Sequence, residues 1–378
     1  MVVALLGGVF VALCVGYLIV RYPSMHFGIS HDMPDVGPQK FHLKPTPRIG
    51  GIPVLCGLTA AVVLVPTNSP IVELMLPLLL CGLLAFVGGL AEDFTKRIRV
   101  RLRLLLTFVS AALGYFLLDA RITELGLPGF DWALQFTFFS LAFTMFAVGG
   151  FAQAMNIIDG FNGLAGVIAL IFLGAIAYVA TRVGDEPVMW SALLLGGAIL
   201  GFLVLNYPKG LVFLGDGGAY LIGFLIAELA VLFVHRNTEV SPWFALALLS
   251  YPVVEVIFSM YRKKILRGQS AGEPDGLHLH MLIHKRLVRR FSGRVQASPD
   301  VWANPLTSPF LWLLASLPVL PTLVLWNDTA MLQGVVVTFV ALYLVLYWQI
   351  VRFRSPRLLR LRRRSAPPIE EITSSTPT

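Results

Sequence analysis

Apolar segments, each about long enough to cross a lipid bilayer, dominate this sequence. A transmembrane helix needs roughly 20 predominantly apolar residues, and such segments follow one another to about residue 351. We place eleven of them, at 2–20, 50–67, 71–90, 104–119, 132–155, 163–181, 188–206, 217–235, 242–260, 309–326 and 333–351. Only 13% of the residues are charged, about half the share in a soluble domain. The sequence therefore predicts an all-α integral membrane protein, with one polytopic domain over 1–351.

Lysine and arginine are divided unevenly between the two sides of this predicted bundle. If the segments thread alternately, twenty-six of the twenty-nine Lys and Arg residues fall on one side, and the other side keeps Arg121, Arg182 and Arg236. Basic loops stay in the cytoplasm, so we expect the N-terminus outside and the C-terminus inside. The net charge of +8 then faces anionic membrane lipid, which argues against nucleic acid as a partner.

Two regions outside the spans carry most of the polar sequence. The largest cytoplasmic loop, 261–308, contains a histidine cluster. Beyond the last span, 352–378 begins as a basic juxtamembrane segment and ends in a Pro/Ser/Thr-rich stretch that we expect to be disordered.

Polar and acidic motifs gather where predicted spans meet the cytoplasm. They are Gly88-Gly-Leu-Ala-Glu92-Asp93, Asn156-Ile-Ile-Asp159-Gly-Phe-Asn162-Gly163, Asn206-Tyr-Pro-Lys209-Gly-Leu-Val-Phe213-Leu-Gly215-Asp216-Gly217-Gly218 and Pro274-Asp275-Gly-Leu-His278-Leu-His280. Any one acid at a helix end is more often a cap or a solvated charge. Independent caps, however, have no reason to collect on one membrane face, so we interpret the motifs as one site.

The chemistry of these motifs suits phosphate and a divalent cation. Carboxylates beside apolar helix ends are costly unless they are neutralised, and Mg²⁺ prefers one or two carboxylates together with substrate phosphate oxygens. The glycines around Asp216 let the backbone approach a phosphate and offer N–H donors at a helix start.

The motifs resemble those of the polyprenyl-phosphate N-acetylhexosamine-1-phosphate transferases, from about Lys40 to about Leu287. The resemblance rests on Pro45-Thr-Pro-Arg48-Ile-Gly50-Gly51, Glu92-Asp93, Asn156-x-x-Asp159-Gly-x-Asn162-Gly-Leu-Ala and Phe213-Leu-Gly-Asp216-x-Gly. It differs at two points, because the family usually has paired Asp where Glu92-Asp93 stands and often has consecutive His where this chain reads His278-Leu-His280. The second difference favours the branch that starts O-antigen or related envelope glycans over the branch that acts on UDP-muramoyl-pentapeptide.

The resemblance implies a bacterial inner-membrane enzyme that transfers N-acetylhexosamine-1-phosphate from a UDP-sugar to undecaprenyl phosphate and releases UMP. It implies Mg²⁺, with Mn²⁺ as a substitute, and allows a homodimer. Asp216 would be the principal metal ligand, and Asp93 would be a base or a second metal-site residue. Catalytic and substrate-binding roles fall on Asp93, Asp159, Asp216, Lys44, Arg48, Glu92, Asn156, Asn162, Asn206, Phe213, His278 and His280.

An ion-coupled transporter is the rival class, because Glu73, Glu228 and Glu255 lie in or near apolar spans. Transporter sites lie near the bilayer midplane, whereas the polar motifs here collect at one face. The sequence leaves open the sugar, which could be GlcNAc, GalNAc, FucNAc or QuiNAc, and the glycan pathway.

Overall fold

The computed structural model describes residues 1–25, 30–32, 45–266, 268, 276–288 and 303–352. Lys44, and the tail after Arg352, therefore lie outside the described residues. The helices are α1 (Val2–Arg21), α2 (Gly51–Val63), α3 (Pro70–Thr95), α4 (Val100–Leu117), α5 (Pro128–Leu134), α6 (Thr137–Ile158), α7 (Leu164–Val183), α8 (Glu186–Asn206), α9 (Gly215–Arg236), α10 (Phe244–Leu248), α11 (Ser250–Tyr261), α12 (Leu279–Ile283), α14 (Ala303–Val324) and α15 (Thr329–Val351). Shorter helical turns cover Pro23–Met25, Arg262–Leu266 and His284–Val288, and two short strands, β1 (His31–Asp32) and β2 (Thr46–Pro47), pair antiparallel.

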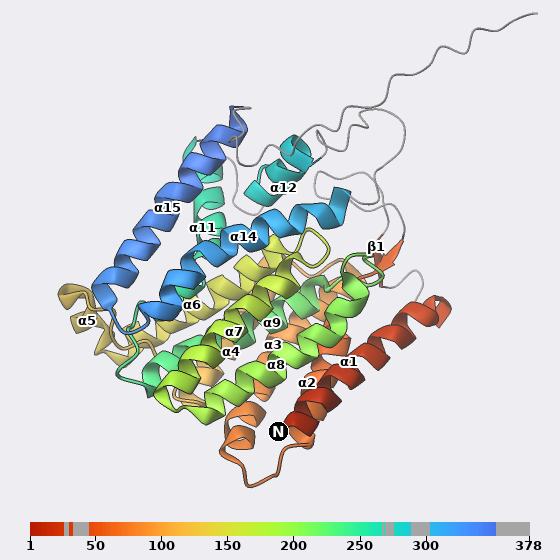
Figure 1. The fold of residues 1–378 in the computed structure, drawn as a ribbon, viewed down its shortest axis with the longest axis horizontal. Helices are drawn as coiled ribbons and strands as arrows, with labels where there is room; N and C mark the ends of the chain where they lie inside the picture. Colours follow the sequence, from red (N-terminus) through yellow and green to blue (C-terminus); the bar gives the residue numbers. More distant parts are fainter. Residues whose placement is uncertain (26–29, 33–44, 267, 269–275, 289–302, 353–378) are drawn as a thin grey trace, which may run out of the picture.

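The prediction of an all-α, multi-pass membrane protein is confirmed (Figure 1). Among the described residues, nine helices are long and apolar enough to cross a membrane. Two of the eleven predicted spans differ. The segment 50–67 forms a helix only over Gly51–Val63, because Pro66 disfavours helical backbone just before it.

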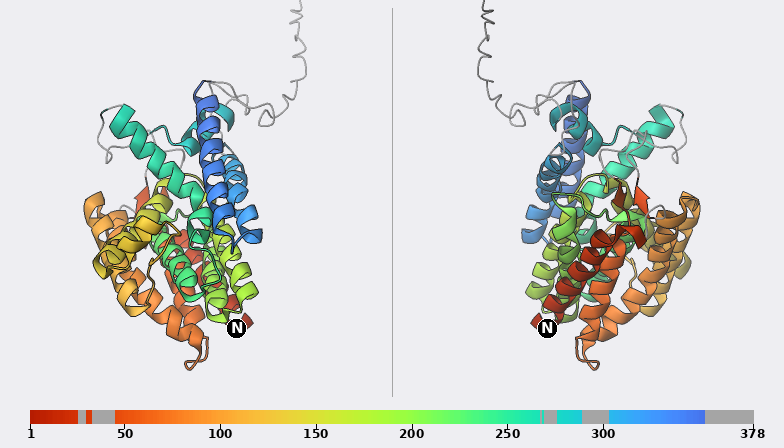
Figure 2. Two further views of the ribbon diagram at one scale, coloured as in Figure 1. Left: turned by 90° about the vertical axis from the view of Figure 1, so that its left-hand side faces the viewer. Right: turned by 90° about the vertical axis from the view of Figure 1, so that its right-hand side faces the viewer.

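The second difference is the predicted span 242–260, which is divided into α10 and α11 at Leu249. Pro252, in the first turn of α11, has no N–H to donate, so a continuous helix would lose a hydrogen bond there. The break gives α11 a direction of its own, and Figure 2 shows it projecting at the same end of the molecule as α12.

Helix α9 is the centre of the bundle. Every residue from Gly217 to Phe233 is buried, as expected of a helix that is apolar on all sides. Helices α3 and α6 pack against it, and small residues permit the close approach. A Cβ on Gly223 would lie 2.7 Å from the Ala152 Cα in α6, and one on Gly89 in α3 would lie 2.6 Å from the Asp216 carbonyl carbon.

The two ends of the bundle differ in content. The N-terminus of α1 lies at the end opposite α12, and α12 contacts α14 and α15 (Figures 1 and 2). The motif residues at the C-terminal ends of α3 and α6 and at the start of α9 occupy the half of the molecule nearer α12. This arrangement suits the predicted gathering of motifs on one face, while the orientation of that face in the membrane stays a prediction.

Candidate active site

Two sequence motifs, 45–51 and 213–218, are held side by side by their backbones. The N–H of Phe213 donates to the Pro47 carbonyl at 2.8 Å, and the N–H groups of Gly50 and Gly51 donate to the carbonyls of Phe213 and Leu214, each at 2.9 Å. Gly215 has a φ of +74°, which glycine adopts at no steric cost. The pairing places Arg48 beside Asp216, although the two are 168 residues apart.

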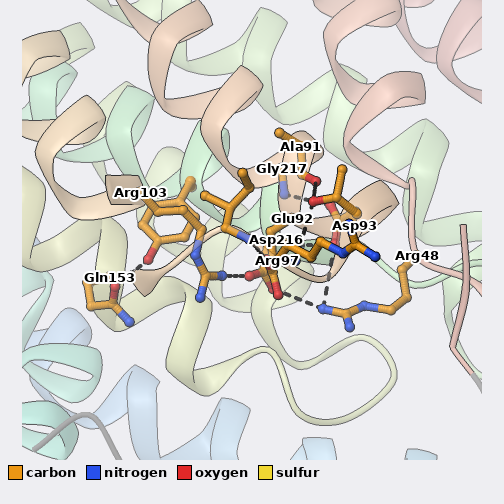
Figure 3. Close-up of polar contacts among 12 residues, drawn as sticks. Arg48, Ala91, Glu92, Asp93, Arg97, Arg103, Gln153, Asp216 and Gly217 are labelled. Carbon is orange, nitrogen blue, oxygen red and sulfur yellow. Dashed lines mark hydrogen bonds and ion pairs between the residues drawn. The ribbon is translucent and has the colours of Figure 1, made fainter. Parts of the chain in front are cut away.

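Two arginines converge on the Asp216 carboxylate (Figure 3). Arg48 Nη2 lies 3.0 Å from Asp216 Oδ1, and Arg103 Nη1, from α4, pairs with Asp216 Oδ2. The Arg103 guanidinium also lies over the Tyr220 ring, 5.8 Å from its centroid, and the Tyr220 hydroxyl bonds to Gln153 in α6. The sequence did not indicate Arg103, Tyr220 or Gln153 as site residues.

Asp93 lies behind Asp216 and binds the backbone. Its Oδ1 accepts from the Asp216 N–H at 2.9 Å and its Oδ2 accepts from the Gly217 N–H at 2.8 Å. Its side chain is 1% exposed, and Arg48 Nη2 lies 3.5 Å away. A carboxylate at a helix N-terminus satisfies N–H groups that have no partner within the helix. Asp93 therefore fixes the start of α9, and with it the position of Asp216.

Glu92 has a different hydrogen-bond partner from the neighbouring Asp93. Its Oε2 accepts from the Ile98 N–H at 2.7 Å, across the left-handed turn at Lys96 that ends α3. The adjacent acids thus have separate contacts, as expected for neighbouring helical positions about 100° apart.

The turn between α6 and α7 is held by amides. Asn162 donates from Nδ2 to the Pro208 carbonyl at 3.0 Å, and its N–H donates to Asn304 Oδ1 at 2.9 Å. Asn206 accepts from the Gly163 N–H at 2.6 Å and donates to the Val212 carbonyl at 2.8 Å. These bonds show that Asn162 and Asn206 join this turn to the loop before Asp216. Asn156 is partly exposed in the last turn of α6.

Asp159, the first residue after α6, shares an electrostatic environment with the Asp216 cluster. Burial raises the pKa of the Asp159 carboxyl to about 7, and attraction to the Arg48 guanidinium opposes this rise only in part. A carboxyl with a strongly shifted pKa beside a charged partner is typical of functional sites.

The histidine segment packs on the same turn. His280 Nε2 would lie 3.4 Å from a Cβ on Gly160, and the Phe161 ring contacts His280 and His284 at centroid distances of 5.9 and 5.0 Å. The His278 and His280 rings are stacked, with centroids 5.3 Å apart. The structure thus brings His278 and His280 to the Asp159 turn, next to the Asp216 cluster. Phe213 is partly exposed in the loop just before Asp216.

The donor set allows a metal ion only in company with substrate. No group of three or more His, Cys, Asp or Glu side chains able to hold a metal occurs among the described residues. Asp93 gives both its oxygens to backbone N–H groups, so of this pair it is Asp216, with 14% of its side chain exposed, that can reach a metal ion. One carboxylate plus phosphate oxygens is a common Mg²⁺ environment, so Asp216 fits this ion.

Comparison with known proteins agrees with this geometry. Residues 75–234 match the family model described as glycosyl transferase family 4. Undecaprenyl-phosphate alpha-N-acetylglucosaminyl 1-phosphate transferase of Salmonella typhi is 30% identical over 251 residues, which cover 65% of this chain and 67% of the relative. The protein of that name from Yersinia pestis is 29% identical over 253 residues, with the same coverage. A probable undecaprenyl-phosphate N-acetylglucosaminyl 1-phosphate transferase of Bacillus subtilis is 25% identical over 247 residues, covering 64% of this chain and 66% of the relative.

The matched residues contain the features that define the site: Asp93 at the end of α3, the amide-held turn after α6, and the Asp216 turn that opens α9. The resemblance stated from the sequence motifs is thereby confirmed, and the chain belongs to glycosyl transferase family 4.

Proposed function

We propose that this protein transfers N-acetylhexosamine-1-phosphate, with N-acetylglucosamine the first candidate sugar, from its UDP-sugar to undecaprenyl phosphate. An oxygen of the lipid phosphate forms a bond to the sugar-bearing phosphorus, the bond from that phosphorus to the bridging oxygen breaks, and UMP leaves. The product is a lipid-linked sugar diphosphate that would start an envelope glycan of the O-antigen type. The convergence of Arg48 and Arg103 on Asp216 is the observation that carries this proposal.

The two arginines suit the charges that meet in this reaction. Both substrates are anions, and phosphoryl transfer depends on positioning and charge stabilisation more than on covalent chemistry. Arg48 comes from the loop before α2 and Arg103 from α4, so the two guanidiniums approach Asp216 from different elements. We assign both guanidiniums to phosphate oxygens of the two substrates, which would join Asp216 as their partners.

The reaction does not require a protein base. The second pKa of a phosphate monoester is about 6, so a lipid phosphate is already largely ionised at neutral pH. This fits the position of Asp93, whose carboxylate binds backbone N–H groups. We therefore assign Asp93 to holding Asp216 in place.

Mg²⁺ is the metal we propose, with Mn²⁺ as a substitute and Asp216 as its protein ligand. When bound, the ion would supply positive charge to the diphosphate. The Asp159 turn and Phe213 flank Asp216, and we assign them to the nucleotide. His278 and His280 would contact phosphate or sugar from the opposite side of that turn.

The experiment is a substrate panel with purified protein in detergent and undecaprenyl phosphate. UDP-GlcNAc, UDP-GalNAc, UDP-FucNAc, UDP-QuiNAc and UDP-muramoyl-pentapeptide are offered separately, and UMP is measured. We expect UMP from at least one UDP-N-acetylhexosamine and none from the pentapeptide substrate. UMP from the pentapeptide substrate alone would instead assign the protein to peptidoglycan synthesis. No UMP from any of them, with folded protein, would refute the proposal.

A further inference from the structure

A buried carboxylate on α11 faces the histidine segment. The Glu255 side chain is 1% exposed and comes from a helix that the sequence motifs do not include. Its Oε1 accepts from the Leu279 N–H at 2.7 Å and lies 3.2 Å from His278 Nδ1. An ionised carboxylate buried without such partners would be strongly destabilising, so the two groups offset the cost of its burial.

The same oxygen, Glu255 Oε1, lies close to the rings of both His278 and His280. His280 Nδ1 lies 3.8 Å from Glu255 Oε1, whereas His280 Nε2 is directed at Gly160, next to Asp159. Since the two rings are stacked with an interplanar angle of 10°, they present corresponding edges. The Nδ1 edges face Glu255, and the Nε2 edge of His280 faces the turn between α6 and α7.

We propose that Glu255 is a positioning residue that sets the orientation and tautomer of His278 and His280. The carboxylate keeps the Nδ1 atoms directed toward α11, which holds the Nε2 edge of His280 against the turn that carries Asp159. A hydrogen bond to one ring nitrogen determines which nitrogen carries the proton. The inference rests on the proposed function, since it concerns the same substrates.

Other groups already hold the backbone of this segment. Arg262 Nη1 donates to the Leu277 carbonyl at 2.6 Å, and the Tyr347 hydroxyl donates to the same carbonyl at 3.2 Å. Arg286 Nη1 donates to the Ile350 carbonyl at the end of α15 at 2.8 Å. The segment is therefore attached to the turn after α11 and to α15 by groups other than Glu255, which holds the Leu279 N–H and the imidazole rings.

The test is a double-mutant cycle in the UMP-release assay with UDP-GlcNAc and undecaprenyl phosphate. Glu255→Gln keeps the side-chain size and an oxygen acceptor for Leu279 but removes the charge behind the histidines. We expect kcat/KM to fall about 10- to 100-fold, by analogy with residues that orient metal-bound histidines. In a His278→Ala, His280→Ala background, adding Glu255→Gln should change kcat/KM by less than about twofold, because a residue acting through the histidines has nothing left to orient.

Glu228→Gln is the matched control. Glu228 is a fully buried glutamate on α9 that lies against Gly114 of α4. Glu228→Gln therefore makes the same chemical change elsewhere in the bundle, and its kcat/KM should stay within about twofold of wild type. If the histidine variants turn over too slowly, the same cycle is measured on the Kd of labelled UDP-GlcNAc.

The outcomes are separable. Wild-type kcat/KM in Glu255→Gln, or an equal loss with and without the histidines, would overturn the positioning role. A wild-type protein that folds but releases no UMP would refute the proposed function itself.

Discussion

Asp93→Asn tests whether this carboxylate organises the start of α9 or takes part directly in the chemistry. Asparagine offers one acceptor oxygen where the aspartate uses two, at 2.9 Å to the Asp216 N–H and 2.8 Å to the Gly217 N–H. One of these N–H groups would then face the side-chain NH₂. The site is buried, with Asp93 1% exposed, so no water replaces the lost acceptor.

The size of the effect follows from those two bonds. A buried donor left unsatisfied costs about 1–3 kcal/mol, and the surviving bond loses its charge assistance. A total of about 3 kcal/mol should lower the Tm measurably. The displaced α9 start also misplaces Asp216, so transferase activity should fall as well.

The assay pairs thermal unfolding in detergent with UMP release, and the neighbouring residue supplies the control. Glu92→Gln keeps an oxygen for the Ile98 N–H, so Tm and most activity should be retained. An Asp93→Asn variant with wild-type Tm and abolished activity would refute the organising role and indicate that Asp93 acts as a base in the reaction. A larger loss from Glu92→Gln than from Asp93→Asn would show that the assigned contacts of the two acids are wrong.

Further predictions concern the nucleotide, the charge of Asp159 and the topology. Phe213→Leu should raise KM for the UDP-sugar about fivefold, because aromatic stacking is worth on the order of 1 kcal/mol. The change in kcat should be smaller, since stacking acts on bound substrate and transition state alike. An unchanged KM with a collapsed kcat would place the Phe213 ring away from the nucleotide. Burial raises the pKa of Asp159 to about 7. Between the ordinary aspartate pKa of 3.8 and about 7, the folded state therefore binds more protons than the unfolded state, and stability falls as pH rises. Thermal unfolding from pH 5 to pH 8 should therefore show a steeper fall in Tm for the wild type than for Asp159→Asn, and parallel curves would contradict this. Cysteines introduced near Arg121, Asp185 and Glu239 should be labelled from outside the cell, and labelling of 276–288 from that side would overturn the predicted orientation.

The sequence predicted the membrane architecture and the main site motifs because both depend on local sequence patterns. Apolar length predicted the nine membrane-length helices found among the described residues. It overestimated 50–67 and 242–260 because Pro66 and Pro252 act on the backbone without changing hydropathy. The approach of the glycines around Asp216 to a phosphate stays a prediction; in the structure these glycines permit close contacts with Arg48 and Gly89, and the N–H groups of Asp216 and Gly217 bind Asp93.

The parts that the sequence missed depend on partners far apart in the chain. Arg103 was counted as one more basic loop residue, yet it lies within α4 and pairs with Asp216, 113 positions later. Glu255 suggested an ion path, because an acid in an apolar segment has no visible partner until α11 is placed beside the histidine segment. Tyr220 and Gln153 resemble ordinary span residues until α6 and α9 are packed together. For Arg103 the sequence did contain a signal. It is an arginine at the start of an apolar span, and such a charge must face protein or the membrane interface.

The most direct test of the central claim is the fate of the phosphorus next to the sugar. UDP-GlcNAc labelled with ³²P on its β-phosphate is incubated with undecaprenyl phosphate, Mg²⁺ and either wild-type protein or Asp216→Asn, and label is followed in lipid and nucleotide fractions. We expect label in the lipid, unlabelled UMP as the released nucleotide, and neither product with a folded Asp216→Asn variant, because its side chain lacks the carboxylate that Arg48 and Arg103 approach. Labelled UDP as the released product would mean that the sugar is transferred without its phosphate, and full activity of Asp216→Asn would remove Asp216 from the site; either result would contradict the account.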